Sequence, residues 1–323
     1  MSTMRALVYE RYGPPEQVLR LEHLPRPQPK PGEVLVRVHA VSLNSWDWDL
    51  LIGAPMGRVS GPFRPPHKVL GADIAGTVEA VGQGVTAFQP GDPVFGDLSE
   101  AKWGGLADYV CAPASALAPI PAGLSFTDAA AIPQAGGLAI QGIRKVPGLG
   151  PAHTVLVNGA GGGVGTFAIQ LAKPTGATII AVDRAEKRDA LLALGADEFI
   201  DYLSDDYTAT PDRYDLIIDM VANRPAARYA SCLKPNGRLI VIGGTFRGLI
   251  GVALRGLVTR EKSLGVLFYK VSPQDSVELA GKTRPVIDST FPLEDGAKAF
   301  RRLGSGMHVG KVIVTTGPAN PSP

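Results

Sequence analysis

The sequence predicts an α/β protein built from a β-rich domain and a doubly wound domain with a parallel sheet. Residues 4–120 contain short β-branched or alternating segments separated by proline and glycine, which is typical of antiparallel sheets and barrels. From Thr154 onward, apolar strand-like segments alternate with amphipathic helix-like segments. This second pattern is typical of parallel β-α-β units with helices on both faces of the sheet.

The composition is that of a globular chain long enough for two domains. The chain has 323 residues, of which 45% are hydrophobic and 19% are charged, a balance that argues against extensive disorder. Its formal net charge is +2 without a long run of one sign, so we expect no nucleic-acid partner. Cys111 and Cys232 form no Cys-x-x-Cys pair, which argues against a disulfide framework and a zinc ribbon.

No segment has the character of an export signal or a membrane anchor. The first residues, MSTMRALVYERYG, lack the long apolar core of a secretory signal. No apolar run approaches the length of about 20 residues that spans a bilayer. We therefore expect a cytoplasmic protein without an integral membrane segment.

The β-rich part comes first along the chain. Its strands are expected within residues 5–10, 33–43, 73–82 and 107–113, between turns such as PRPQPKPGE and FQPGDPV. The character of the sequence changes near Ser125, which has the position of an N-cap before a helical stretch over 125–146.

The doubly wound part follows with a regular alternation. Helices are expected over 163–173, 185–195 and 224–233, and strands over 154–158, 178–183, 197–202, 214–221 and 237–244. After this part, the regular alternation ends, and we expect a strand in 284–293, a helix in 294–306 and a strand in 310–316. This order predicts a first domain over 1–124, an inserted domain over 125–282 and a return to the first domain over 283–323.

The segment VNGAGGGVGTFAIQLAK, residues 157–173, is the most informative motif. It follows a predicted strand and opens a predicted helix, where a dinucleotide pyrophosphate binds to the uncapped N–H groups and the positive end of the helix dipole. A strict G-x-G-x-x-G pattern is absent, because its positions hold Ala160, Gly162 and Gly165. These three residues and the intervening Gly163 and Val164 are the predicted cofactor contacts. The alternative is a close helix–strand crossing with no ligand.

The acidic residue after the next strand bears on which dinucleotide binds. Asp183 lies 18 positions after Gly165, where a carboxylate accepts hydrogen bonds from the adenosine ribose and favours NAD. Arg184, Lys187 and Arg188 follow at once and could pair with a 2′-phosphate instead, or form a solvated helical turn. The residues by themselves leave the two cofactors undecided.

The chain resembles a known superfamily through several segments in matching order. NGAGGGVGTFAIQLAK, ALGADEFIDY, YDLIIDMV, LGADIAGTVEAVG and PGDPVFG are similar to segments of the medium-chain dehydrogenase/reductases, and most of all to their zinc-independent quinone-oxidoreductase branch. The likeness covers about residues 4–315. It implies a GroES-like catalytic domain in 1–124 and 283–323, a Rossmann domain in 125–282, a cofactor in the cleft between them and a homodimer.

The zinc ligands of the zinc-dependent members have no counterparts in this chain. Asn44 stands where those members carry a cysteine, and Ala72-Asp73 stand where they carry His-Glu. The four-cysteine lobe is also missing. His67 and Asp73 are the remaining candidates nearby, and two ligands do not make a tetrahedral site. We therefore expect no metal.

The resemblance implies hydride transfer from a nicotinamide to a quinone or an α,β-unsaturated carbonyl, without metal. Asn44 matches an asparagine near the nicotinamide, which orients the ring or the acceptor carbonyl, although a turn-capping role is the alternative. Asp47 matches an acid that relays a proton or, equally, holds a structural hydrogen bond. Lys187 and Tyr202 match two residues that bind the 2′-phosphate of NADPH, so NADP(H) is slightly favoured and NAD(H) stays open.

The remaining expectations concern the end of the cofactor path and other functions. Gly243 and Gly244, at the end of the strand predicted over 237–244, are expected to contact the cofactor. Leu138 replaces a threonine that commonly bonds it, and Ala222 replaces a usual glycine.

The basic and apolar stretch 245–262 is a flexible lip, a membrane-surface contact or a core helix. Two other functions stay open: an enoyl reductase or alcohol dehydrogenase-like enzyme of a biosynthetic pathway, and an NADPH-binding structural or regulatory protein with little turnover.

Overall fold

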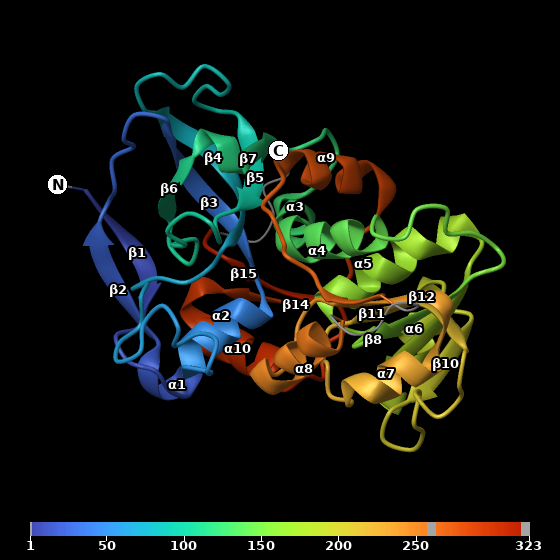
Figure 1. Ribbon diagram of the computed structural model, residues 1–323. Helices are drawn as coiled ribbons and strands as arrows, with labels where there is room; N and C mark the ends of the chain where they lie inside the picture. Colours follow the sequence, from blue (N-terminus) through green and yellow to red (C-terminus); the bar gives the residue numbers. More distant parts are fainter. Residues whose placement is uncertain (1, 257–262, 318–323) are drawn as a thin grey trace. The chain divides into compact units, whose positions relative to one another are not determined.

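The computed structural model describes residues 2–256 and 263–317 (Figure 1). The chain divides into two compact units, which are described separately below. Unit 1 comprises Met1–Gly137 with Val271–Pro323, and unit 2 comprises Leu138–Lys270. The predicted α/β class is confirmed, with a mainly antiparallel sheet in unit 1 and a parallel sheet in unit 2.

Unit 1 is organised around one large sheet. Its strand order is β14-β15-β3-β4-β5-β7, and β6 pairs with the remaining length of β3. All neighbours are antiparallel except β14 and β15. The strands are β3 (Glu33–Leu43), β4 (Asp73–Val81), β5 (Pro93–Asp97), β6 (Tyr109–Pro113), β7 (Leu117–Pro119), β14 (Ile287–Pro292) and β15 (Lys311–Thr315), and a separate antiparallel pair is β1 (Thr3–Val8) with β2 (Arg20–Pro25).

Short helices complete unit 1. They are α1 (Pro15–Val18), α2 (Ser45–Ile52), α3 (Phe126–Ala131), α9 (Pro273–Lys282) and α10 (Gly296–Gly304), with 3-10 turns at Ala114–Ala116 and Leu293–Asp295. Figure 1 shows α2 and α10 side by side although they come from opposite ends of the chain. The helix α4 (Pro133–Ile143) begins in unit 1 and ends in unit 2.

The core of unit 1 holds β15, from the end of the chain, against β3. Val312 and Val314 of β15 are fully buried beside Val41 of β3, and Phe300 of α10 belongs to the same cluster. Burying each such apolar side chain contributes roughly 1.5–3 kcal/mol. The return of the chain to the first domain therefore has a physical cause, because these late residues complete an early sheet.

Unit 2 is a doubly wound domain whose strands all run parallel. Their order is β10-β9-β8-β11-β12-β13, so the order reverses between β8 and β11. In such sheets, ligands bind at the carboxyl ends of the strands at this switch point. The strands are β8 (Thr154–Asn158), β9 (Thr178–Asp183), β10 (Glu198–Asp201), β11 (Tyr214–Asp219), β12 (Leu233–Val241) and β13 (Ser263–Val266).

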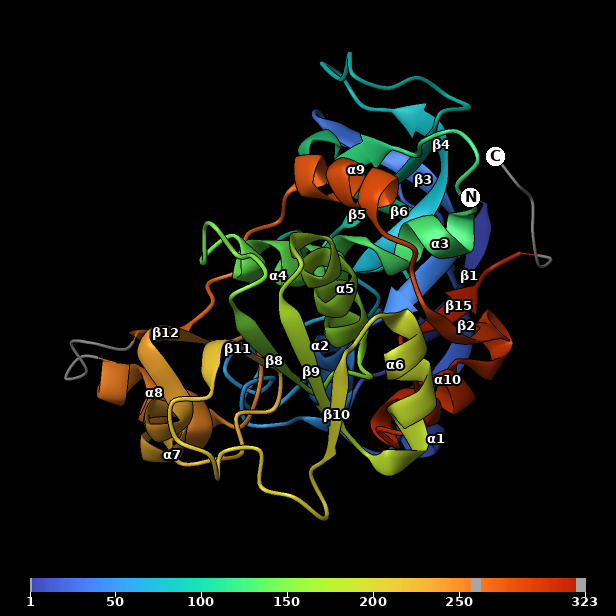
Figure 2. The same cartoon turned by 90° about the vertical axis from the view of Figure 1, so that its right-hand side faces the viewer.

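Helices cover both faces of this sheet. In Figure 2, α5 and α6 lie on one side of the strands, whereas α7 and α8 lie on the other. Their bounds are α5 (Gly163–Ala172), α6 (Arg188–Leu194), α7 (Ala226–Cys232) and α8 (Phe246–Gly256), with 3-10 turns at Lys173–Thr175 and Ala185–Lys187. Within the described ranges, no helix is both long and apolar enough to cross a membrane.

The structure corrects several predicted elements. The single helix expected over 125–146 is two helices, α3 and α4, which meet at Ile132. Pro133 has no N–H to continue the hydrogen bonds of α3, and it is instead the first residue of α4. Ser125 does cap α3, since its Oγ accepts the Asp128 N–H at 3.1 Å. The helix expected over 185–195 begins as a 3-10 turn and becomes α-helical only at Arg188. Of the stretch 245–262, residues 246–256 form α8, and 257–262 lie outside the described residues.

The strand expected over 237–244 is displaced. The observed β12 begins at Leu233, which pairs with Tyr214 of β11, and it ends at Val241. Gly243 and Gly244 therefore lie in the loop after the strand, at its carboxyl end.

Candidate functional site

The glycine-rich segment forms a tight turn between β8 and α5. The N–H groups of Gly159 and Ala160 both donate to the carbonyl of Val182, at 3.0 and 3.1 Å, and Gly159 has a φ of +80°. Gly162 is the N-cap of α5 and offers no side chain to bond the N–H groups of Gly163, Val164 and Gly165. An uncapped helix start after a strand is suited to a phosphate group.

The reasons for the glycines differ along the turn. A Cβ on Gly165 would lie 2.4 Å from the Ala160 carbonyl oxygen, and one on Gly161 would lie 2.4 Å from Cδ of Lys187. Packing against the backbone requires Gly165, whereas a Cβ on Gly161 would displace the Lys187 side chain. A Cβ on Gly162 would meet only the Gly159 oxygen, at 3.4 Å. The close approach of the helix to the turn therefore explains Gly165, but it does not explain Gly162, where a Cβ would make an ordinary contact.

The four residues predicted for the adenosine end of the cofactor are brought together at the ends of β9 and β10. Asp183 pairs with Asp201 across these strands, and the N–H of Tyr202 donates to the Asp183 carbonyl at 3.3 Å. The carboxylate of Asp183 accepts the N–H of Gly161 at 2.8 Å and that of Arg184 at 2.9 Å, and Lys187 Nζ lies 3.1 Å from it. The Arg184 side chain pairs with Glu186.

A buried polar network lies at the switch point, and the sequence reasoning missed it. Asn158 ends β8 and Asp219 ends β11, and these two residues are paired neighbours in the sheet. Asn158 Nδ2 donates to the carboxylate of Asp219 at 2.9 Å, and the hydroxyl of Tyr229 donates to the same carboxylate at 2.5 Å. Polar residues that end two adjacent parallel strands are the signal that could have found this network.

The same carboxylate sets the loop that follows β11. Asp219 accepts the N–H groups of Val221 and Ala222, both at 2.7 Å, and Ala222 has a φ of +47°. A left-handed conformation costs a residue with a Cβ about 1–2 kcal/mol, which explains why glycine is usual there. A Cβ on Gly244 would lie 2.6 Å from the Ala222 Cβ, and one on Gly243 would lie 3.0 Å from the Met220 oxygen. Packing between the two loops thus accounts for Gly244, whereas a Cβ on Gly243 would require only a small shift of its neighbour.

A second cluster lies in unit 1 and contains the predicted catalytic residues. Asn44, which is 6% exposed, is the N-cap of α2, and its backbone N–H donates to Asp47 at 2.8 Å. Its side-chain Nδ2 donates to Asp73 at 3.0 Å, and its Oδ1 accepts a hydrogen bond from Lys311 Nζ. Lys311 was not predicted.

Asp47 is fully buried, and each of its carboxylate oxygens accepts one backbone N–H. The donors are Asn44 and Gly71, both at 2.8 Å. Burial raises the pKa of Asp47 to about 7, and the two backbone hydrogen bonds oppose this rise. These contacts favour the structural role over the proton relay.

Asp73 and Lys311 form a buried pair of opposite charge. The distance from Lys311 Nζ to Asp73 Oδ2 is 3.9 Å, and the exposed fractions of the two side chains are 3% and 0%. Burial and the neighbouring Asp97 raise the pKa of Asp73. Burial lowers the pKa of Lys311, although the carboxylates of Asp73, Asp47 and Asp97 act in the opposite direction.

Gln134 is the second residue of this cluster that the sequence reasoning missed. Its backbone N–H points at the Asp73 carboxylate, 3.2 Å from the nearer oxygen. Its side chain is 3% exposed, and Nε2 has no hydrogen-bond partner among the residues the structure describes. A glutamine beside a proline in an otherwise apolar helix, PQAGGLAIQ, was the available signal.

His67 and Asp73, the two residues considered as metal ligands, belong to no metal-binding group among the described residues. Across residues 2–256 and 263–317, no group of three or more His, Cys, Asp or Glu side chains could hold a metal ion. His67 stacks near Trp103 with ring centroids 5.7 Å apart. Asp73 already accepts hydrogen bonds and faces an ammonium, which is a poor setting for a divalent cation.

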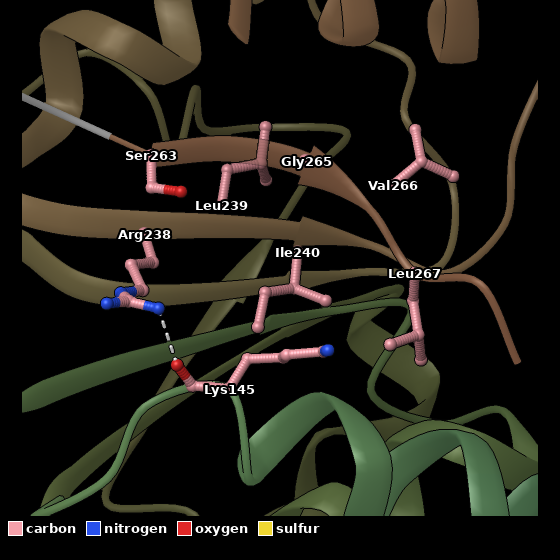
Figure 3. Close-up of a pocket in the computed structure, with 8 residues that line it drawn as sticks. All are labelled: Lys145, Arg238, Leu239, Ile240, Ser263, Gly265, Val266 and Leu267. Carbon is pink, nitrogen blue, oxygen red and sulfur yellow. Dashed lines mark hydrogen bonds between the residues drawn. The ribbon is translucent and has the colours of Figure 1, made fainter. Parts of the chain in front are cut away.

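A cavity of about 120 Å³ lies at the β12–β13 edge of unit 2 and holds none of the predicted site residues (Figure 3). It is lined by apolar residues such as Ile240 and Leu267 and by Arg238, which donates to the Lys145 carbonyl at 2.7 Å. Ligand sites commonly reach 300–1,000 Å³. The cavity is therefore not the candidate site.

Comparison with known proteins covers almost the entire chain. Residues 30–122 match a family model described as alcohol dehydrogenase GroES-like domain, and residues 194–314 match one described as zinc-binding dehydrogenase. Quinone-oxidoreductase QR1, chloroplastic, of Triphysaria versicolor is 33% identical over 325 residues, which cover 96% of this chain and 98% of the relative. 2-methylene-furan-3-one reductase of Solanum lycopersicum is 33% identical, with 97% of this chain and 79% of the relative covered.

A solved structure gives the same result. The quinone oxidoreductase from Coxiella burnetii superimposes with a TM-score of 0.87 at 28% sequence identity, and the match covers 98% of this chain and 100% of that chain. The expected GroES-like and Rossmann architecture is thereby confirmed. The chain belongs to the medium-chain dehydrogenase/reductases, in their quinone oxidoreductase-like branch, and is an oxidoreductase.

Proposed function

We propose that the protein reduces quinones or α,β-unsaturated carbonyl compounds with NAD(P)H, without zinc. The observation that carries this proposal is the turn from β8 to α5, where a Cβ on Gly162 would clash with no protein atom and the helix start is uncapped. The names of the two curated relatives, one a quinone oxidoreductase and the other an enone reductase, support the acceptor class.

The residues of unit 2 fit a dinucleotide. The N–H groups of Gly163, Val164 and Gly165 would hold the pyrophosphate, and the network of Asn158 and Asp219 lies at the carboxyl ends of the strands that form the switch point. We favour NADPH over NADH. The carboxylate of Asp183 is already bonded to Gly161, Arg184 and Lys187, which reduces its freedom to accept ribose hydroxyls, and the Lys187 ammonium would attract a 2′-phosphate.

The residues of unit 1 do not fit a catalytic zinc ion. Asn44 and Ala72-Asp73 stand at the ligand positions, and Lys311 brings a positive charge to the same cluster. We therefore derive no step through a metal.

The protein supplies binding and orientation to the reaction. Reduced nicotinamide, when bound, supplies the hydride. Asn44 presents an amide N–H to the acceptor carbonyl oxygen and so favours the charge that develops there. Asp47 holds the start of α2 through its two backbone hydrogen bonds, which fixes the position of Asn44. Solvent supplies the proton that completes the reduced product.

A substrate panel tests the proposal. The purified protein is mixed with NADPH or NADH and a set of quinones and enones, and loss of absorbance by the reduced nicotinamide is followed. We expect turnover with at least one acceptor and a preference for NADPH. Cofactor binding seen by fluorescence, with no turnover on any acceptor, would overturn the proposal and favour a structural or regulatory NADPH-binding protein. Enoyl thioesters with NADPH or NADH, and alcohols with NADP+ or NAD+, are tested beside this panel. Turnover confined to either of these two classes would favour the biosynthetic alternatives.

Metal and assembly are tested on the same preparation. Metal analysis that finds stoichiometric zinc would refute the zinc-free mechanism. A homodimer and a cytoplasmic location stay predictions, and light scattering on the purified protein checks the first of them.

A further inference from the structure

Lys311 is a buried lysine at the first position of β15. Val312 pairs with Leu43, so the antiparallel register puts Lys311 opposite Asn44. Its backbone N–H donates to the Val286 carbonyl at 2.8 Å. The preceding Gly310 has a φ of +85°, and a Cβ there would lie 2.0 Å from the same carbonyl oxygen. The backbone therefore fixes where this side chain starts.

The ammonium group faces several charged groups. It donates to Asn44 Oδ1 and lies 3.9 Å from Asp73 Oδ2, and Asp47 and Asp97 also act on its charge. A buried ammonium is strongly unfavourable unless it is paired and hydrogen-bonded. An apolar residue would fill the start of this strand at lower cost, so the lysine calls for an explanation beyond packing.

The consequence of this arrangement is seen at Asn44. A lysine ammonium can only donate hydrogen bonds, and an ionised carboxylate can only accept them. Asn44 therefore turns its oxygen to Lys311 and its nitrogen to Asp73. In the reverse orientation, the amide N–H groups would face the ammonium and the amide oxygen would face the carboxylate, so neither hydrogen bond could form. The amide nitrogen carries two N–H bonds, and Asp73 uses one of them.

We propose that Lys311 is a positioning residue that locks the Asn44 amide so that its second N–H is presented to the acceptor carbonyl oxygen. The kinetic part of this inference rests on the proposed reductase function. The orientation of the amide does not, because it follows from contacts within unit 1.

Kinetics test whether Lys311 acts through Asn44. Lys311→Met keeps the length of the side chain and removes its charge, and we expect kcat to fall 10- to 100-fold with the Kd for NADPH unchanged within about twofold. In an Asn44→Ala background, the same substitution should change kcat less than threefold, because the group to be positioned is gone. Lys298→Met, which removes an exposed ammonium of α10, should leave kcat unchanged. Equal effects of Lys311→Met in both backgrounds would overturn the inference.

A second measurement does not depend on turnover. The side-chain amide signals of Asn44 are identified by NMR from their loss in Asn44→Ala, and their exchange with solvent is measured. We expect Lys311→Met to broaden these signals and to accelerate exchange at least tenfold. Unchanged signals would overturn the inference even in an active enzyme, whereas an inactive wild type with the expected change would overturn only the proposed function. If Lys311→Met does not fold, Lys311→Met with Asp73→Asn removes both charges and is tested in the same way.

Discussion

The ammonium of Lys187 lies 3.1 Å from the carboxylate of Asp183, and both side chains are more than nine-tenths buried. The sequence suggested opposite roles for these residues, since the acid favours NAD and the lysine favours NADP. In the structure they neutralise each other beside the glycine-rich turn. Under the proposed function, selection of the cofactor would be a competition for Lys187 between this carboxylate and a 2′-phosphate.

Removing the lysine should therefore discriminate between the cofactors. We expect Lys187→Met to weaken NADPH binding at least tenfold and NADH binding less than threefold, as measured by fluorescence titration, because a charge-assisted hydrogen bond contributes about 1.5–3 kcal/mol. Lys173→Met, which removes an exposed ion pair with Asp197, is the matched control. Since a buried carboxylate is left unpaired, Lys187→Met with Asp183→Asn is measured beside it. Equal losses for both cofactors would contradict the prediction.

The glycines of the turn should respond differently to substitution. Gly162→Ala should leave the melting temperature unchanged within about 2 °C, since a Cβ there meets only one atom at 3.4 Å, whereas Gly165→Ala should lower it clearly because its Cβ would lie 2.4 Å from a carbonyl oxygen. Gly162→Asp should fold and lose dinucleotide binding, because its charge stands against the pyrophosphate. A Gly162→Asp protein that binds NADPH normally would refute the assignment of this turn.

The stability of the protein should depend on the ionisation of Asp47. Its pKa is raised from 3.8 to about 7 in the folded state. Between these values the folded protein keeps a proton that the unfolded chain has lost, so this group makes the free energy of unfolding fall as the pH rises from about 4 to 7. Asp47→Asn cannot ionise, and its urea denaturation should therefore show a weaker decline over this interval. Parallel curves for the two proteins would show that Asp47 does not titrate in this range.

Replacing Gln134 by an apolar residue should stabilise the fold and weaken binding of the acceptor. Its buried Nε2 has no partner among the described residues, so Gln134→Leu should raise the free energy of unfolding by about 1 kcal/mol. If this amide contacts the acceptor, the same variant should raise the KM for the acceptor at least fivefold. Gln141→Leu in the same helix removes an amide that is bonded to the Lys270 carbonyl at 2.8 Å, and it should instead be destabilising. A loss of stability in Gln134→Leu, with an unchanged KM, would contradict both expectations.

The sequence pattern within single segments was sufficient to predict much of the fold. The strands at 33–43, 154–158 and 178–183 were predicted with their observed bounds, because apolar, β-branched runs between turn residues specify a buried strand. The start of β12 was not, since its pairing with β11 decides where it begins. The break before Pro133 was also missed, although the proline is itself a local signal that ends a helix. The turn at residues 159–165 was also identified, because strand, glycines and helix are contiguous in the chain.

The sequence by itself determined the two kinds of sheet, the glycine-rich turn and the absence of the usual zinc ligands at Asn44 and Asp73. Tertiary structure decided which polar groups meet. Lys311 lies 267 positions from Asn44, and only the antiparallel register of β15 against β3 brings them together. Asn158 and Asp219 meet in the same way, through the pairing of β8 with β11. Such contacts arise from sheet pairing between distant segments, and no periodicity within one segment encodes them.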